Sequence, residues 1–129
     1  MDMSKWLIWL VRFGSTELDA ANVEYTFEKK DVKFKYLRAR DFKGVEDPCT
    51  AVVQLGVSPD KPKEGLDFFA KMCASRPDLP HLLATHDGMP YVKERLGDLK
   101  NAQYIVRPRD NGEIILFKLK EMLAAKAVG

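Results

Sequence analysis

Five short apolar runs, rich in β-branched and aromatic residues, are spaced along the chain between longer polar or amphipathic stretches. They cover residues 6–11, 32–37, 51–55, 82–85 and 104–106. The first, third and fourth runs are almost continuously apolar, which is typical of strands buried on both faces of a parallel sheet. The second run alternates Val, Phe and Tyr with lysines, which favours an edge strand protected by charge. The pattern therefore predicts the strands of an α/β protein.

The stretches between these runs have the period of amphipathic helices. Helices are predicted from a cap at Ser15 or Thr16 to about Lys30, and over 62–75, 89–99 and 111–126. The link between the second and third runs has no room for a full helix, because a glycine and a proline interrupt it. Alternating strands and helices imply right-handed crossovers that place helices on both faces of the sheet. We therefore expect one flavodoxin-like, doubly wound (βα)5 sandwich over 1–129. Its five parallel strands take the order 2-1-3-4-5, its second helix is shortened or lost, and any site lies at the carboxyl ends of the strands.

Composition narrows the class of protein further. The chain has 129 residues, 46% of them hydrophobic and 31% charged, as expected of a single globular domain with a real core. Its net charge of +2 is too small to favour nucleic acid or a membrane as a partner. The first apolar run is too short to span a bilayer, and no signal peptide is recognised. We therefore expect a cytoplasmic protein in which Cys49 and Cys73 are reduced thiols.

Three segments follow one another in a familiar order. Residues 65–69, residues 76–86 and the sequence Tyr104-Ile105-Val106-Arg107-Pro108 resemble the third helix, fourth strand and fifth strand of response-regulator receiver domains. The resemblance extends over nearly the whole chain, from Lys5 to about Ala124. It implies that Thr85 stands at the switch hydroxyl of that family, Tyr104 at its switch aromatic and Pro108 at the proline that follows a cis bond.

The positions that carry phosphorylation in this family have different side chains here. The resemblance places Leu55, or else Gly56, at the phosphoaccepting aspartate, Arg12 and Phe13 at the acidic pair that holds magnesium, and Arg107 at the lysine. Phosphoryl transfer to a protein needs a carboxylate nucleophile and a divalent cation, which in turn requires oxygen ligands. Arg12 would also repel that cation, since two like charges about 4 Å apart cost roughly 4 kcal/mol at an effective dielectric near 20. We therefore expect a pseudo-receiver that uses neither a metal nor another cofactor.

The function expected of such a domain is phosphorylation-independent signalling or scaffolding through protein–protein contacts. No Ser-His-Asp set, glycine-rich phosphate loop or paired carboxylates at the strand ends indicates an enzyme. The contact surface is predicted at the helix of 89–99, the strand of 104–106 and the last helix, where receivers dimerise or meet partners. Tyr104, Ile114 and Phe117 are its candidate residues, although Ile114 and Phe117 could instead wrap the edge of the core.

An alternative function is sensing of a small anion or nucleotide in the vacated phosphorylation pocket. Arg12, Thr85 and Arg107 could hold such a ligand, because guanidinium groups bind phosphates and carboxylates in a bidentate manner. The competing interpretation is that the arginines pair with acids such as Asp87 or Asp110 and simply fill the metal site. Without a ligand to bias two states, the switch formed by Thr85 and Tyr104 is expected to be fixed in one of them.

Overall fold

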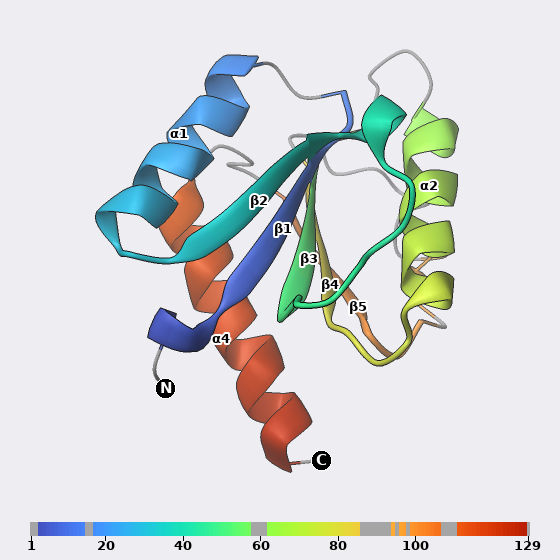
Figure 1. The fold of residues 1–129 in the computed structure, drawn as a ribbon. Helices are drawn as coiled ribbons and strands as arrows, with labels where there is room; N and C mark the ends of the chain where they lie inside the picture. Colours follow the sequence, from blue (N-terminus) through green and yellow to red (C-terminus); the bar gives the residue numbers. More distant parts are fainter. Residues whose placement is uncertain are drawn as a thin grey trace.

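The computed structural model describes residues 3–14, 17–57, 62–85, 94, 96–97, 99–106 and 111–128. Five strands form one parallel sheet in the order β2-β1-β3-β4-β5 (Figure 1). Their bounds are β1 (Leu7–Arg12), β2 (Lys33–Arg38), β3 (Ala51–Leu55), β4 (His81–Thr85) and β5 (Ala102–Val106). The predicted flavodoxin-like order is confirmed, and the strand with alternating lysines lies at one edge of the sheet as expected.

Helices cover both faces of this sheet. Helices α1 (Glu17–Lys29) and α4 (Gly112–Val128) lie on one face, and α2 (Pro62–Ser75) lies on the other (Figure 1). All three were predicted, with ends that differ by at most two residues. Most of the helix predicted over 89–99 lies outside the described residues. Of the residues in this range that the structure describes, Glu94 and Leu96 are helical.

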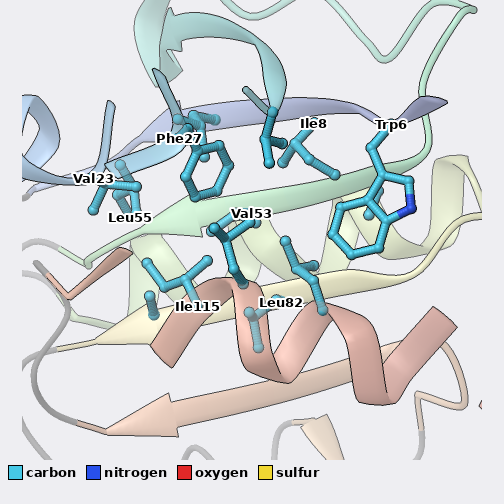
Figure 2. Close-up of a cluster of buried hydrophobic side chains, with 14 of the residues drawn as sticks. Trp6, Ile8, Val23, Phe27, Val53, Leu55, Leu82 and Ile115 are labelled. Carbon is cyan, nitrogen blue, oxygen red and sulfur yellow. The ribbon is translucent and has the colours of Figure 1, made fainter. Parts of the chain in front are cut away.

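Side-chain alternation along the strands divides the core into two layers. One layer joins the sheet to α1 and α4, and Figure 2 shows members of it from Trp6 at one end to Val23 and Leu55 at the other. The second layer joins the opposite face of the sheet to α2 through Trp9, Val52 and Phe69. Because β1, β3 and β4 are buried on both faces, their carboxyl ends are held firmly in one row.

Two helical glycines allow unusually close packing. A Cβ atom at Gly112 would lie 2.5 Å from the Cβ of Thr26, so α4 approaches α1 at a distance that only glycine permits. A Cβ atom at Gly65 would lie 2.6 Å from the Cβ of Val57, which follows β3. The buried amide of Gln54 also donates from Nε2 to the carbonyl oxygen of Gly65 at 3.1 Å. The first turns of α2 are thereby fixed beside the carboxyl end of β3.

An irregular segment replaces the second helix of the alternating pattern. After a single 3-10 turn, η2 (Ala39–Asp41), residues 42–50 run without regular structure from β2 to β3, close to α2 (Figure 1). We name residues 42–50 the strap. Its Phe42 ring lies edge-on to Trp9 of β1, with centroids 6.5 Å apart, and edge-on to Phe68 of α2, at 5.6 Å. The predicted loss of the second helix is therefore confirmed, and the strap buries apolar surface in its place.

Candidate functional site

The site residues predicted from the sequence gather at the carboxyl ends of three neighbouring strands. Arg12, Leu55 and Thr85 are the last residues of β1, β3 and β4, and Arg12 pairs in register with Leu55. The backbone pairing continues beyond the strands, because the amide of Phe13 donates to the carbonyl oxygen of Leu55 at 2.9 Å. The amide of Gly56 donates in the same way to the carbonyl oxygen of Ala84 at 2.7 Å. Arg107 lies outside the described residues.

Leu55 has no functional group to offer at this edge. Its side chain is 1% exposed and packs in the core layer beneath α1 and α4. The next residue, Gly56, has a φ of 82°, which is the left-handed conformation that glycine adopts readily. Neither residue can accept a phosphoryl group, because that chemistry needs a side-chain oxygen or nitrogen nucleophile.

Phe13 makes the site more apolar. Its ring lies 5.4 Å from the ring of Phe68 in α2, with the two planes tilted by 42°. Through Phe68 it joins a row of aromatic rings that continues to Phe42 of the strap and Trp9 of β1. Such a row packs as hydrocarbon and supplies no ligand for a hard cation such as magnesium.

Arg12 lies beside two further arginines that the sequence analysis did not single out. Together with Phe13, Gly14 and Ala39, the side chains of Arg12, Arg38 and Arg40 line an open hollow of about 420 Å³. Arg12 and Arg38 are register partners on β1 and β2. The sequence could have indicated the pairing of Arg12 with Arg38. Strands 1 and 2 were expected to be neighbours, and an arginine follows the apolar run of each.

Thr85 lies apart from this hollow. It is buried at the end of β4, and it is not among the described residues that line the hollow. Arg12 and Thr85 therefore share the carboxyl edge of the sheet, with β3 between their strands. The described part of the structure brings Arg12 together with Arg38 and Arg40.

The candidate contact residues are exposed. Phe117 is 65% exposed, and Ile114 and Tyr104 are 38% and 36% exposed. The side chain of Asn111 caps α4 by accepting hydrogen bonds from the amides of Glu113 and Ile114, at 3.1 and 3.2 Å. Phe117 is thus mostly outside the core, and the contact role of Tyr104, Ile114 and Phe117 stays a prediction. Tyr25 of α1 is also exposed, at 66%.

The titratable side chains that are buried have structural roles. Burial raises the pKa of Cys49 to about 11 and that of Cys73 to about 12, so neither thiol is reactive at neutral pH. His81 opens β4, and its burial lowers its pKa to about 4. Within the described ranges, no three His, Cys, Asp or Glu side chains are grouped as a metal would require. No helix in that same part of the chain is long and apolar enough to cross a membrane.

Comparison with known proteins identifies the fold. No profile of a protein family and no curated protein matches the sequence. Solved structures do match. They include a response regulator receiver protein from Pseudoalteromonas atlantica, with a TM-score of 0.69 and 16% identity over 93% of this chain and 98% of that one. The chemotaxis protein CheY4 of Vibrio cholerae matches with a TM-score of 0.68 and 17% identity, over 91% and 98% of the two chains.

A third match shows that the likeness extends over nearly the whole molecule. The signal receiver domain of an HD domain-containing protein from Pseudomonas fluorescens has a TM-score of 0.69 and 12% identity, over 97% of this chain and all of that one. The class defined by these structures is the CheY-like receiver domain, and this chain has its fold. At such low identities the comparison establishes the fold and leaves function to the chemistry of the site.

Proposed function

We propose that this protein is a pseudo-receiver, which signals or scaffolds by binding another protein or a second copy of itself without being phosphorylated. The observation that carries the proposal is Leu55. A buried hydrocarbon side chain occupies the position at which the resemblance implies the phosphoaccepting aspartate. Receiver-type signalling must then proceed through a surface that is already formed.

The chemistry of the neighbouring positions supports this proposal. An acyl phosphate forms when a carboxylate attacks phosphorus while a divalent cation neutralises the oxygens of the transferred group. Arg12 and Phe13 replace both carboxylates that would hold the cation, and the Phe13 ring packs against Phe68. Restoring one carboxylate would therefore be insufficient, because the metal would still lack ligands and would meet the charge of Arg12.

The exposed apolar residues of β5 and α4 are the surface that we assign to partner binding. Phe117 and Ile114 lie three residues apart in α4 and so are neighbours on the helix surface. Charged residues lie next to them, including Lys118 and Glu121, whose Nζ and Oε2 atoms are 3.4 Å apart. An apolar centre with a charged rim is the usual composition of a protein–protein interface. Complete burial of a ring such as that of Phe117 contributes about 1.5–3 kcal/mol.

Beryllofluoride with magnesium, which mimics a phosphoryl group on aspartate, tests the absence of phosphorylation. We expect the backbone amide spectrum to remain unchanged when both are added, because no carboxylate is available to receive the mimic. A receiver domain that retains its aspartate serves as the control in the same buffer. Changes centred on the amides of Leu55 and Thr85 would show that the site is functional and would overturn the proposal.

A second candidate function is anion sensing by Arg12, Thr85 and Arg107. It is favoured by the position of Arg12 and Thr85 at the ends of β1 and β4, where ligands of open α/β sheets bind. A phosphate or nucleotide at 100 times its dissociation constant should stabilise the wild-type protein by about 2.7 kcal/mol in a thermal-shift assay, and Arg107→Ala should abolish this gain. If no such anion shifts the melting temperature, this candidate is wrong.

A further inference from the structure

We propose that an open hollow at the amino-terminal edge of the sheet binds a small organic acid. The apolar body of the acid would lie against the wall of the hollow, and the ammonium groups of Lys100 and Lys126 would hold its carboxylate. The hollow has a volume of about 400 Å³, which lies within the usual size range of small-molecule sites. The site goes beyond the proposed protein-contact function, and its described lining shares no residue with the surface of Tyr104, Ile114 and Phe117.

Three segments meet at this end of the sheet. Residues 77–80 lead into β4, residues 100–101 lead into β5, and the last turns of α4 complete the lining. Because the strands are parallel, the segments that precede them lie at the edge opposite to the carboxyl ends, where Arg12 and Thr85 lie. Figure 1 shows the end of α4 and the turn from α2 to β4 at this edge. The hollow is therefore separate from the pocket of the second candidate function.

The walls of the hollow are held in place by hydrogen bonds. The side-chain amide of Asn101 donates from Nδ2 to the carbonyl oxygens of Cys73, Arg76 and Leu79, at 3.2, 3.2 and 3.0 Å. These bonds connect the start of β5 to the end of α2 and to the turn before β4. A proline at each end of residues 77–80 further restricts the backbone of that turn. The hollow is therefore largely preformed, as most small-molecule sites are.

Hydrocarbon surface forms much of the lining. It is contributed by Pro77, Leu79, Pro80, Met122 and Ala125. Leu79, Pro80 and Met122 are buried, so packing of the protein interior fixes their positions. An apolar ligand body placed against this surface would remove it from water, which favours binding. The fitting ligand therefore has an apolar portion, which an inorganic anion lacks.

The charge of the described lining comes from Lys100, Lys126 and Asp78. Both lysines are exposed, and the ammonium of Lys126 donates to the carbonyl oxygen of Asp78. An ammonium has three donors, so this bond to an uncharged acceptor leaves two for a ligand. The carboxylate of Asp78 accepts hydrogen bonds from Nε and Nη2 of Arg76, at 3.0 and 2.9 Å, so its charge is balanced by that arginine. The two ammonium groups therefore favour an anion, and a carboxylate has one oxygen for each.

Titration of the wild-type protein with hexanoate, 1-hexanol and acetate, followed by amide chemical shifts, tests the proposal. Hexanoate has both the apolar body and the charge, whereas 1-hexanol lacks the charge and acetate lacks the body. We expect hexanoate to bind most tightly and to move the amide resonances of Leu79, Gln103 and Ala125 first. Added sodium chloride should weaken the binding of hexanoate, because salt screens interactions between exposed charges.

The double substitution Lys100→Gln/Lys126→Gln isolates the contribution of charge. It should weaken hexanoate binding about five-fold, because two exposed ion pairs are lost, and leave 1-hexanol binding unchanged. Lys120→Gln is the matched control, since it removes an exposed cation of α4 that is not among the described lining residues. The proposal is wrong if hexanoate does not bind, if 1-hexanol or acetate binds as tightly, or if Lys120→Gln weakens binding as much as the double substitution. It is also wrong if the shifts centre on Gly14, because the acid would then occupy the carboxyl edge of the sheet.

Discussion

His81 shows how a single buried side chain couples this fold to pH. Its Nε2 atom lies 3.1 Å from the carbonyl oxygen of Arg76, and its Nδ1 atom has no hydrogen-bond partner among the described residues. The ring of Phe69 lies edge-on to the imidazole, with centroids 6.2 Å apart. An imidazolium in these surroundings would be desolvated, so burial lowers the pKa of His81 from 6.5 to about 4.

The depressed pKa of His81 predicts a loss of stability in mild acid. Above pH 6.5 the imidazole is neutral in both the folded and the unfolded chain, so its effect on the free energy of unfolding no longer changes with pH. As the pH falls from 6.5 to 4, the unfolded chain takes up a proton that the folded chain does not, so the free energy of unfolding decreases by up to about 3 kcal/mol. Urea unfolding at pH 7, 6, 5 and 4 measures this decrease.

The control is His81→Gln, whose amide remains neutral and can still donate a hydrogen bond to Arg76. Its profile should be nearly flat between pH 6.5 and 5. The pKa of Asp78, which hydrogen bonds from Arg76 lower to about 2, affects stability only below its ordinary value of 3.8. Desolvation raises the pKa of Glu24 above 4.5, so protonation of Glu24 favours the folded chain and acts in the opposite direction as the pH falls through that raised pKa. Equal slopes for wild type and His81→Gln would contradict the role given to His81.

At the scale of single residues, the sequence predicted positions better than contacts. Leu55 was placed at the end of its strand because counting along one segment is enough to find it. Arg38 was not singled out, because its importance depends on a partner in another strand, Arg12. A side-chain cluster from two strands can be predicted only after the register of those strands is known, and register depends on packing of the whole sheet.

At the scale of elements, the strap is the feature that sets this chain apart from a regular alternation of strands and helices. Arg76, which follows α2, donates from Nη1 to the carbonyl oxygen of Val45 at 3.1 Å and from Nη2 to Asp47 at 3.0 Å. Its Nε and Nη2 atoms also contact Asp78, at 3.0 and 2.9 Å. On the other side, the indole of Trp9 donates to the carbonyl oxygen of Pro48 at 3.3 Å. The strap is therefore fixed from both α2 and β1.

Removing the guanidinium fork should loosen the strap while the sheet stays intact. In Arg76→Ala we expect the described amides of the strap to exchange hydrogen with solvent at least ten-fold faster, because local opening no longer breaks the bonds to Val45 and Asp47. Arg76→Lys keeps the charge without the planar fork and should restore only part of the protection. Hydrogen exchange followed by NMR measures both variants. If the strap amides of Arg76→Ala exchange as slowly as those of the wild type, the apolar contacts of the strap alone hold it in place.

The sequence predicted which element would be missing and did not predict what would replace it. A glycine and a proline between β2 and β3 were enough to rule out a full helix. The residue that holds the strap, Arg76, is 31 positions away from Val45, and no local pattern links them. The five strands and the three described helices were predictable because each carries its own local apolar pattern, a continuous or alternating run for a strand and a helical period for a helix.

At the scale of the whole molecule, the arginine-lined hollow and the proposed contact surface lie toward opposite edges of the sheet. The arginine hollow lies at β1 and β2, and the contact surface lies on β5 and α4, with β3 and β4 between. The sequence correctly indicated that Phe117 is exposed, because Phe117 falls off the apolar stripe of its helix. We therefore expect substitutions in one region to leave the other unaffected, because the two regions share no contacts.

The contact surface predicts a loss of association when its centre is charged. Phe117→Glu places a carboxylate where we expect a partner to bury the ring, and Tyr104→Ala removes aromatic area at β5. We expect each change to weaken association at least ten-fold, since aromatic residues at the centre of an interface usually contribute more than about 1.4 kcal/mol. Sedimentation equilibrium measures self-association, and retention of a partner by immobilised protein measures binding to another chain. Tyr25→Glu is the matched control, because Tyr25 is equally exposed but lies on α1. If neither Phe117→Glu nor Tyr104→Ala alters any association, or if Tyr25→Glu alters it as much, the surface has been assigned to the wrong face.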